Sequence, residues 1–231
     1  MNELNLYSIV EKDLDFKEEI EELYNAYELF INQIEPSSLI DIGCGQGDFL
    51  IQIAREDMST FGIDLSDEQI KVCQSKGIKS ACIDISDIKD KYDCATAMFD
   101  VLNYIDKENL KHFIQSTYDV LNDNSYFIFD VNTLFGFEEV AQGSLNINKP
   151  DRFIGIDAYF EEEKLSTSIT LFQKEADNLY KKYNETITQY YHSKEYLEEL
   201  LQSIGFEVQN ALEFKLHDED NADKYIFLCK K

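Results

Sequence analysis

The sequence predicts an α/β fold, in which a mostly parallel β-sheet is flanked by helices and carries a small antiparallel β insertion. Two observations support this prediction. From residue 38 to about 133, apolar strand-like segments alternate with amphipathic helix-like ones, as in chains that build parallel sheets. From residue 134 to 192 the pattern changes to a period of two, which is typical of antiparallel strands joined by short turns.

We expect one domain with three regions, because 231 residues can bury one substantial core and an elaboration. Residues 1–133 supply an N-terminal helical region and the ligand-binding core. Residues 134–192 form an antiparallel β lid that covers the mouth of the site. Residues 193–231 add a helix and a β-hairpin that complete the core.

The first element that the pattern predicts is a helix over residues 16–34. Its apolar residues recur at steps of three and four, which places them on one face. They are Phe16, Ile20, Leu23, Tyr27, Phe30 and Ile34. Pro36 cannot continue the helix and ends it.

The segment over residues 38–50, SLIDIGCGQGDFL, is the most informative part of the chain. A buried strand runs into a turn with glycine at positions 43, 45 and 47, and a helix with Phe49, Leu50 and Ile53 on its inner face follows. Glycines at alternate positions allow a sharp bend and let a flat ligand lie against the backbone. A turn of this kind, after the first strand of an α/β sheet, is where nucleotide-like ligands bind.

The same turn is poorly suited to phosphate groups. A dinucleotide site has its third glycine one residue later, and a mononucleotide phosphate loop has a Gly-Lys-Ser/Thr sequence that is absent here. Asp48 at the helix start would compete with a pyrophosphate for the same amides, and Asp41 adds further negative charge. A ligand with an adenosine end and a cationic centre, such as S-adenosylmethionine, fits better.

The glycine segment DIGCGQGDF resembles motif I of the class I S-adenosylmethionine-dependent methyltransferases. The segments TFGIDLS (60–66), ACIDISD (81–87) and YDCATAMFDVLNYI (92–105) resemble the next three motifs, and SYFIFDVNT (125–133) resembles strand five. The resemblance extends over residues 38–133 in register, and GFEV at 205–208 matches the closing region. It implies a Rossmann-like sheet of seven strands, with S-adenosylmethionine as cofactor and S-adenosylhomocysteine as product.

The resemblance also implies which residues bind the cofactor. Asp64, which lies 64 − 41 = 23 residues after Asp41, would accept both ribose hydroxyls, and Asp84, with Asp87 as a rival, would accept from the adenine amine. Tyr7 either closes over the cofactor or is a surface tyrosine. The full cofactor-binding set is Tyr7, Asp41, Gly43, Cys44, Gly45, Gly47, Asp64, Leu65, Asp84, Ile85 and Phe99.

No catalytic residue can be assigned from the sequence. Asp100, Asn103 and Tyr104 follow the fourth strand, where donor and acceptor would meet, but a helix cap and a packed ring explain them equally well. His192 lies at the end of the predicted lid and could act as a general base, although a lone histidine is more often structural.

The lid region contains three strand-like segments, RFIGIDAYF (152–160), KLSTSITLFQK (164–174) and LYKKYNETITQYYH (179–192). EEE (161–163) and EADN (175–178) supply the turns. Ser193 then caps a helix that Gly205 ends. FEVQNALEF (206–214) and KYIFLCK (224–230) form the closing antiparallel hairpin.

Composition limits the partners. A net charge of −25 repels phosphate backbones, so we expect a small-molecule acceptor rather than a nucleic acid. No apolar run is long enough to span a membrane, and the first residues lack a secretion signal. Five cysteines without Cys-x-x-Cys spacing indicate reduced thiols of a cytoplasmic protein, and three scattered histidines indicate no metal site. Exposed edges on the lid sheet would allow a monomer or a homodimer.

These observations favour methyl transfer to an oxygen or nitrogen atom of a small molecule by in-line displacement. A second, looser resemblance is to amino-sugar N-methyltransferases and glycine N-methyltransferase-like enzymes. Two alternatives remain open: an aminopropyltransferase of the same fold, and a non-catalytic protein that binds the cofactor and regulates a partner.

Overall fold

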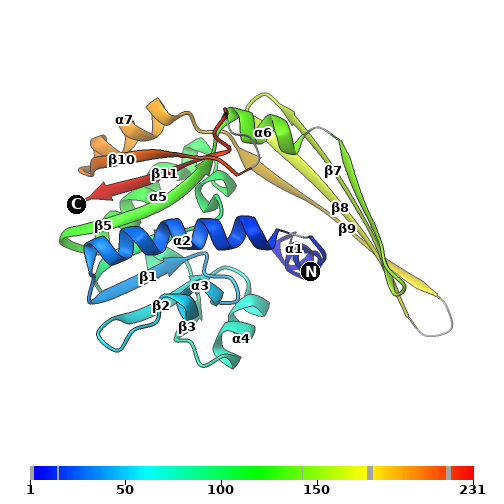
Figure 1. The fold of residues 1–231 in the computed structure, drawn as a ribbon, viewed down its shortest axis with the longest axis horizontal. Helices are drawn as coiled ribbons and strands as arrows, with labels where there is room; N and C mark the ends of the chain where they lie inside the picture. The colour runs from blue at the N-terminus through cyan, green and yellow to red at the C-terminus, as the bar shows by residue number, and fades with distance from the viewer. Residues whose placement is uncertain (1–2, 15, 142, 176–178, 217–219) are drawn as a thin grey trace.

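A computed structural model describes residues 3–14, 16–141, 143–175, 179–216 and 220–231. Its core is a seven-stranded sheet in the order β10-β11-β5-β4-β1-β2-β3 (Figure 1). The parallel strands are β1 (Ser38–Ile42), β2 (Ser59–Asp64), β3 (Ser80–Cys82), β4 (Tyr92–Ala97) and β5 (Leu121–Asn132). The hairpin of β10 (Glu207–Phe214) and β11 (Lys224–Lys230) adds two antiparallel strands next to β5. The predicted seven-stranded, mostly parallel sheet is confirmed.

Helices cover both faces of this sheet. One face packs against α2 (Lys17–Ile34), α3 (Asp48–Gln52) and α4 (Asp67–Ser75). The other face packs against α5 (Lys107–Asp119) and α7 (Lys194–Ile204). The helix predicted over residues 16–34 is confirmed, and it ends where Glu35 adopts a left-handed backbone with φ of 50° just before Pro36.

The antiparallel insertion after β5 is also confirmed, with four strands instead of three. It comprises β6 (Ser144–Asn148), β7 (Arg152–Glu161), β8 (Lys164–Lys174) and β9 (Tyr180–Tyr190). Sequence reasoning missed β6 because SLNIN offers only two apolar residues in alternation. The EEE turn between β7 and β8 is as predicted, with positive φ at Glu162 and Glu163, whereas the EADN turn falls mostly outside the described residues.

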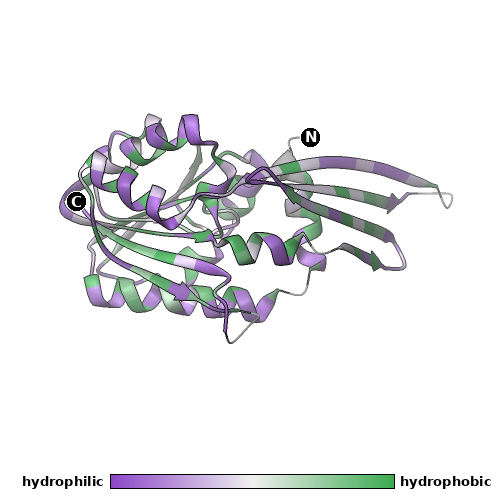
Figure 2. Cartoon of the chain, turned by 90° about the horizontal axis from the view of Figure 1, so that it is seen from above, coloured by the Kyte–Doolittle hydropathy of each residue, from purple (hydrophilic) through white to green (hydrophobic). Residues whose placement is uncertain are grey.

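We call this four-stranded insertion the lid sheet. One of its faces is apolar and the other is polar. The strands extend away from the core in both views, and hydrophobic and hydrophilic residues alternate along them (Figures 1 and 2). The apolar face is covered by the N-terminal helix α1 (Glu3–Val10). This cluster contains Leu6, Val10, Ile154, Ile169, Leu171 and Ile187.

Three 3₁₀ turns and one more helix connect these parts. The turns are η1 (Glu11–Asp13), η2 (Ile85–Asp87) and η3 (Val101–Tyr104), and α6 (Leu134–Val140) follows β5. Asp13 in η1 forms ion pairs with Lys149 and, at 3.2 Å, with Arg152 of the lid sheet. The N-terminal segment is therefore fixed against the lid sheet, an arrangement that the sequence did not predict.

The cysteines are all described, and each is a free thiol; Cys82 is exposed and the other four are buried. No helix in the described part of the chain combines the length and apolarity that crossing a membrane requires.

The aromatic stack across β5 and β11 gives a test of the core. Phe129 is fully buried and its ring lies 4.8 Å from that of Phe227 in a stacked arrangement. We expect Phe129→Ala to lower the free energy of unfolding by about 3–5 kcal/mol, because it leaves a cavity among packed rings.

Urea unfolding followed by circular dichroism would measure this effect. Leu29→Ala, on a side chain that is 71% exposed in α2, is the matched control and should change stability by less than about 0.5 kcal/mol. Equal effects of the two substitutions would contradict this packing of the rings.

Candidate functional site

The candidate site lies where β1, β2 and β4 end. These three strands are neighbours and parallel, so their carboxyl ends meet at one edge of the sheet. The glycine turn follows β1, Asp64 ends β2, and Phe99 and Asp100 follow β4. The structure thus brings together the residues that sequence analysis placed at the first, second and fourth motifs.

All three glycines of the turn have positive φ, at 76°, 52° and 78° for Gly43, Gly45 and Gly47. A Cβ atom at Gly43 would lie 2.7 Å from a methyl group of Val101, and one at Gly47 would lie 2.4 Å from Ile78. At Gly45, by contrast, no described atom other than those of Gly45 and its two chain neighbours lies within 4 Å of such a Cβ. Gly43 and Gly47 are therefore required by packing, whereas Gly45 leaves bare backbone facing open space.

Asp64 fixes the turn and keeps capacity for a ligand. Its carboxylate accepts hydrogen bonds from the amide of Gly45 at 2.9 Å and from the amide of Ser66 at 2.8 Å. The two bonds use different oxygens, and each oxygen can accept another. Burial raises the pKa of Asp64, and the backbone hydrogen bonds oppose that rise.

Asp41 is buried behind the turn, with only 3% of its surface exposed. The Thr96 hydroxyl donates to one of its oxygens at 2.7 Å, and the other oxygen has no hydrogen-bond partner among the described residues. Burial raises the pKa of Asp41 to about 7; the bond from Thr96 counteracts this rise and the Asp64 charge adds to it. A cation bound at the second oxygen would stabilise the ionised form.

Cys44 shapes the turn from within. Its amide donates to the Ile63 carbonyl at 3.0 Å, and its carbonyl accepts from Gly47 at 2.9 Å. Its side chain packs toward Gly62, where an added Cβ would lie 2.6 Å from the sulfur. The backbone polar groups of Cys44 are thus used within the fold rather than presented to a ligand.

Of the residues predicted around the adenine, Leu65 and Asp84 are exposed and Ile85 is buried. Leu65 is 60% exposed, and the exposed Asp84 accepts from the amide and hydroxyl of Ser86 at 2.9 and 2.7 Å. Ile85 is buried in the core.

Asp48 pairs with Lys76 at 2.5 Å, so a cation offsets the charge that we expected to repel a phosphate.

Two residues that contact the site were missed by sequence analysis, one beside the glycine turn and one beside Phe99. Glu11 in η1 accepts a hydrogen bond at 3.3 Å from Gln46 in the glycine turn, and burial raises its pKa. Tyr24 in α2 packs its ring against Phe49 and, with centroids 5.7 Å apart, against Phe99. No motif marks Glu11, because its position depends on how the N-terminal segment folds back over the turn.

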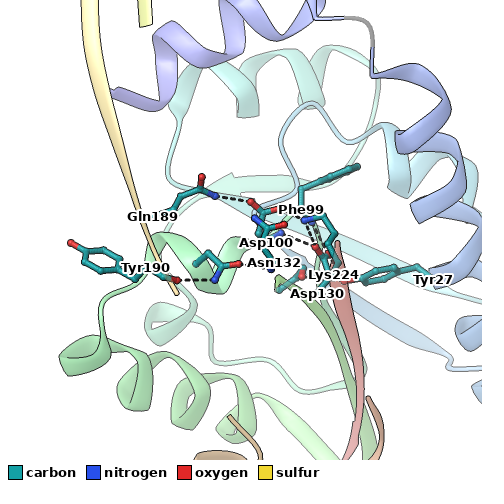
Figure 3. A network of polar contacts seen from close by, with 10 residues as sticks. Tyr27, Phe99, Asp100, Asp130, Asn132, Gln189, Tyr190 and Lys224 are labelled. Atoms are coloured by element: carbon teal, nitrogen blue, oxygen red, sulfur yellow. Dashed lines mark hydrogen bonds and ion pairs between the residues drawn. The ribbon is translucent and has the colours of Figure 1, made fainter. Parts of the chain in front are cut away.

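The turn after β4 has an unusual backbone that a buried carboxylate stabilises. Phe99 and Asp100 both have positive φ, at 57° and 52°, although neither is glycine. The fully buried Asp130 of β5 accepts from both of their amides, at 2.8 and 3.0 Å (Figure 3). It also accepts from the Tyr27 hydroxyl at 2.7 Å and pairs with Lys224 at 2.9 Å.

Asp100 connects this network to the lid sheet. One of its oxygens pairs with Lys224 of β11, and the other accepts at 2.6 Å from the side-chain amide of Gln189 in β9 (Figure 3). Burial acts to lower the pKa of Lys224, but the charges of Asp100 and Asp130 outweigh it and hold the pKa above its ordinary value. Lys224 is therefore a cation at neutral pH. Sequence analysis found Asp100 but missed Asp130, Gln189 and Lys224.

Asn103 and His192 are used by the fold. Asn103 is fully buried; it donates to the Tyr190 carbonyl at 2.8 Å and accepts from the Asn132 amide at 3.0 Å. The ring of His192 is bonded through Nε2 to the carbonyls of Leu102 and Ile105, and burial lowers its pKa. This geometry favours the structural alternative for both residues, and we do not propose either as a catalytic base.

Tyr7, for which the sequence left open closure over the cofactor or a surface position, is half-buried. It packs with Tyr104 at the edge of the apolar cluster between α1 and the lid sheet. Burial, with Asp100 as the next contribution, raises the pKa of Tyr7 to about 12 and that of Tyr104 well above its ordinary value. Both phenols therefore remain protonated hydrogen-bond donors at neutral pH.

Comparison with known proteins identifies the family. A family model for a methyltransferase domain matches residues 16–211. The protein YqeM of Bacillus subtilis (strain 168), which is named as an inferred methyltransferase, is 27% identical over 191 residues, covering 77% of this chain and 76% of its own.

Two solved structures share the fold. An S-adenosylmethionine-dependent methyltransferase from Clostridium acetobutylicum ATCC 824 superposes with a TM-score of 0.79 at 21% identity, covering 98% of this chain and 96% of its own. The sugar N-methyltransferase KedS8 from Streptoalloteichus sp. ATCC 53650 has a TM-score of 0.75 at 13% identity, covering 100% and 93%. At these identities the likeness establishes the fold.

The bare backbone at Gly45 gives the first prediction for the site. We expect Gly45→Ala to weaken binding of S-adenosylmethionine at least about tenfold, because the new methyl group enters the space that the ligand needs. Gly77→Ala is the matched control, since Gly77 also has positive φ, at 82°, and no described atom within 4 Å of a Cβ added there. Calorimetry measures both affinities, and equal losses would show that backbone strain alone is responsible.

Asp41 gives a pH prediction. Below a pKa of about 7 its carboxyl is neutral, so affinity for a cationic ligand should fall as the pH is lowered from about 8 to about 6. Asp64 and Glu11 also face this region, and burial raises both of their pKa values in the same direction. Calorimetric titrations across this range should show a clear slope for the native chain and a flatter one for Asp41→Asn. A slope that Asp41→Asn leaves unchanged would assign the effect to another group.

Proposed function

The chain belongs to the methyltransferase domain family and is an S-adenosylmethionine-dependent methyltransferase, and we propose that its acceptor is a nitrogen or oxygen atom of a small molecule. The observation that supports this most directly is the bare Gly45 backbone flanked by the carboxylates of Asp41 and Asp64. A flat adenosine moiety and a cationic centre need this combination, and it offers little to a phosphate.

The residues of the site fit the cofactor. Asp64 would accept the ribose hydroxyls through the lone pairs that Gly45 and Ser66 leave unused. The unpaired oxygen of Asp41 would face the ammonium group. The apolar surfaces of Leu65 and Phe99, which are 60% and 37% exposed, would pack against the ligand.

The remaining predicted contacts involve the adenine and the shape of the turn. Asp84 would reach the adenine amine, with Ile85 beside it offering only backbone because its side chain is buried. Gly43, Cys44 and Gly47 would act by shaping the turn. We also keep the division into residues 1–133, 134–192 and 193–231, a cytoplasmic location and a monomer or homodimer as proposals.

When bound, S-adenosylmethionine supplies a methyl carbon that its sulfonium activates for displacement. The chain holds the acceptor in line with that carbon, and positioning of this kind can contribute on the order of 7 kcal/mol or more. The helix α1 and the lid sheet pack together beside the site and would limit the access of water to the bound substrates, which would strengthen electrostatic interactions there.

Charge and structural likeness support a neutral or cationic acceptor. The net charge is −25, and Glu11, Asp41, Asp64 and Asp100 all lie around the site. An anionic acceptor would be repelled by these groups. KedS8, whose fold this chain shares, is named as acting on a sugar nitrogen, which is consistent with a nitrogen acceptor here.

The methyltransferase family favours methyl transfer over aminopropyl transfer. A purely regulatory cofactor-binding protein would keep the donor site but would not turn over an acceptor. Production of S-adenosylhomocysteine with a panel of small amines and alcohols separates these alternatives.

Asp64 provides the sharpest test of donor binding. We expect Asp64→Asn to weaken S-adenosylmethionine binding by about 10- to 100-fold, because two charge-assisted hydrogen bonds to the ribose become weaker or are lost. Calorimetry of the native chain and the variant measures this. Asp67→Asn, an exposed acid that pairs only with Lys71 among the described ion pairs, is the control and should bind normally.

Unchanged affinity in Asp64→Asn would remove the ribose assignment alone. Absence of saturable binding to the native chain would remove the proposed function as a whole.

A further inference from the structure

Three polar groups gather beneath the lid sheet, of which only Tyr7 belongs to the cofactor-binding set that the sequence predicted. They are the carboxylate of Asp100 after β4, the hydroxyl of Tyr7 in α1, and the hydroxyl of Tyr104 at the end of η3. Strand β9 connects them, because its Gln189 donates to Asp100 and the strand also contacts α1 and η3. Two segments that are far apart in sequence, α1 and the turn from Asp100 to Tyr104, therefore converge on one place.

The two hydroxyls are available to a ligand. Both rings pack against the apolar cluster that contains Leu6, Val10 and Ile187. Among the described residues neither hydroxyl has a hydrogen-bond partner, and neither belongs to the fully enclosed unpaired atoms. Polar groups in such surroundings are normally satisfied, so a ligand atom that reached either oxygen would be stabilised by a hydrogen bond.

The charge of this region is negative. Asp100 and Asp130 share one cation, Lys224. These two carboxylates and the one ammonium together have a net charge of −1. Glu11 lies near both tyrosines and adds to this charge. The carboxylate of Asp100 has one partner on each oxygen, Lys224 and Gln189, and its side chain remains 16% exposed. Each oxygen can still accept another hydrogen bond.

We infer that Asp100, Tyr7 and Tyr104 form the acceptor-binding subsite, and that the acceptor is a small amine with a neighbouring hydroxyl or ether oxygen. Asp100 receives the ammonium group, and the tyrosines donate to the oxygen. The apolar face of the lid sheet, which includes Ile187, covers the hydrocarbon part. This inference rests on the proposed function, because it assigns the second substrate of the same reaction.

The chemistry balances with these groups. The ammonium releases one proton to Asp100 or to solvent, which frees the nitrogen lone pair. The nitrogen then forms its bond to the methyl carbon as the bond from that carbon to sulfur breaks, and the electron pair of the broken bond stays on sulfur. The methylated ammonium can lose a second proton to solvent. The role of Asp100 is to bind and orient the amine, and no further oxidant or co-reactant is needed.

A matched set of ring compounds tests the chemical class. The probes are trans-2-aminocyclohexanol, trans-1,2-cyclohexanediol and 2-hydroxycyclohexanecarboxylate, each titrated into the full chain saturated with S-adenosylhomocysteine and followed by saturation-transfer NMR. We expect the amine to bind in the millimolar range, the diol at least about fivefold more weakly, and the carboxylate most weakly. No detectable amine binding, or equal or tighter binding of the diol or the carboxylate, overturns the inference.

Variants test the residues. Asp100→Asn should weaken amine binding at least about tenfold, and Tyr7→Phe and Tyr104→Phe should each weaken it severalfold. The tyrosine variants leave the ion pairs of Lys224 intact, so they remain informative if Asp100→Asn unfolds. Asp157→Asn and Tyr159→Phe, both on exposed residues of the polar outer face of the lid sheet, are the matched controls and should bind normally.

Calorimetry with S-adenosylhomocysteine on the same samples separates this inference from the proposed function. If the native chain binds that compound but the amine effects are absent or equal in test and control variants, only the acceptor subsite fails. If the compound itself does not bind, the proposed function fails first.

Discussion

The arrangement of the site depends on one buried carboxylate, that of Asp130. It accepts hydrogen bonds from two amides after β4 and from Tyr27 in α2, and it pairs with Lys224 in β11. Two consecutive non-glycine residues in the left-handed region cost about 1–2 kcal/mol each. Two charge-assisted bonds to those amides offset this cost and hold the turn that directs Phe99 toward the donor side and Asp100 toward the lid sheet. A buried carboxylate without such donors would be strongly unfavourable, so the turn and Asp130 stabilise each other.

A second constraint is that the site concentrates negative charge where water is scarce. Asp41, Asp64 and Glu11 have pKa values that burial raises, which means that each is harder to ionise here than in water. A bound cation would therefore stabilise the ionised forms of these carboxylates more strongly than it would in water. In the proposed donor site, a cationic ligand would therefore relieve repulsion that the fold imposes, a contribution that a flat, solvated binding surface could not provide. In the proposed acceptor subsite, Lys224 already neutralises part of the negative charge of Asp100 and Asp130. The acceptor therefore needs to supply less positive charge.

The parts of the fold that sequence analysis predicted are those that local chemistry determines. The glycine turn, Asp64 at a strand end, the periodicity of α2 and the two-residue turn at Glu162–Glu163 each follow from residues close together in the chain. Asp130, Gln189 and Lys224 carry no local signal, because each acquires its role from partners 30 or more positions away. Glu11 was missed for the same reason, and β6 because its pattern is too short. Sequence patterns thus indicated the residues proposed for the donor and also Tyr7, Asp100 and Tyr104, whereas the network that holds Asp100 required the tertiary arrangement.

The N-terminal segment links the proposed donor site and the proposed acceptor subsite. Glu11 contacts the glycine turn through Gln46, and Asp13 pairs with Lys149 and Arg152 of the lid sheet. Ion pairs that are partly exposed contribute about 1 kcal/mol or less each. Leu6 and Val10 are fully buried against the lid sheet, and burial of such side chains contributes about 1.5–3 kcal/mol each. Apolar packing therefore sets the position of α1, while the polar contacts fix its register. Because α1 also carries Tyr7, its packing on the lid sheet places a residue of the proposed acceptor subsite on the same segment that contacts the glycine turn.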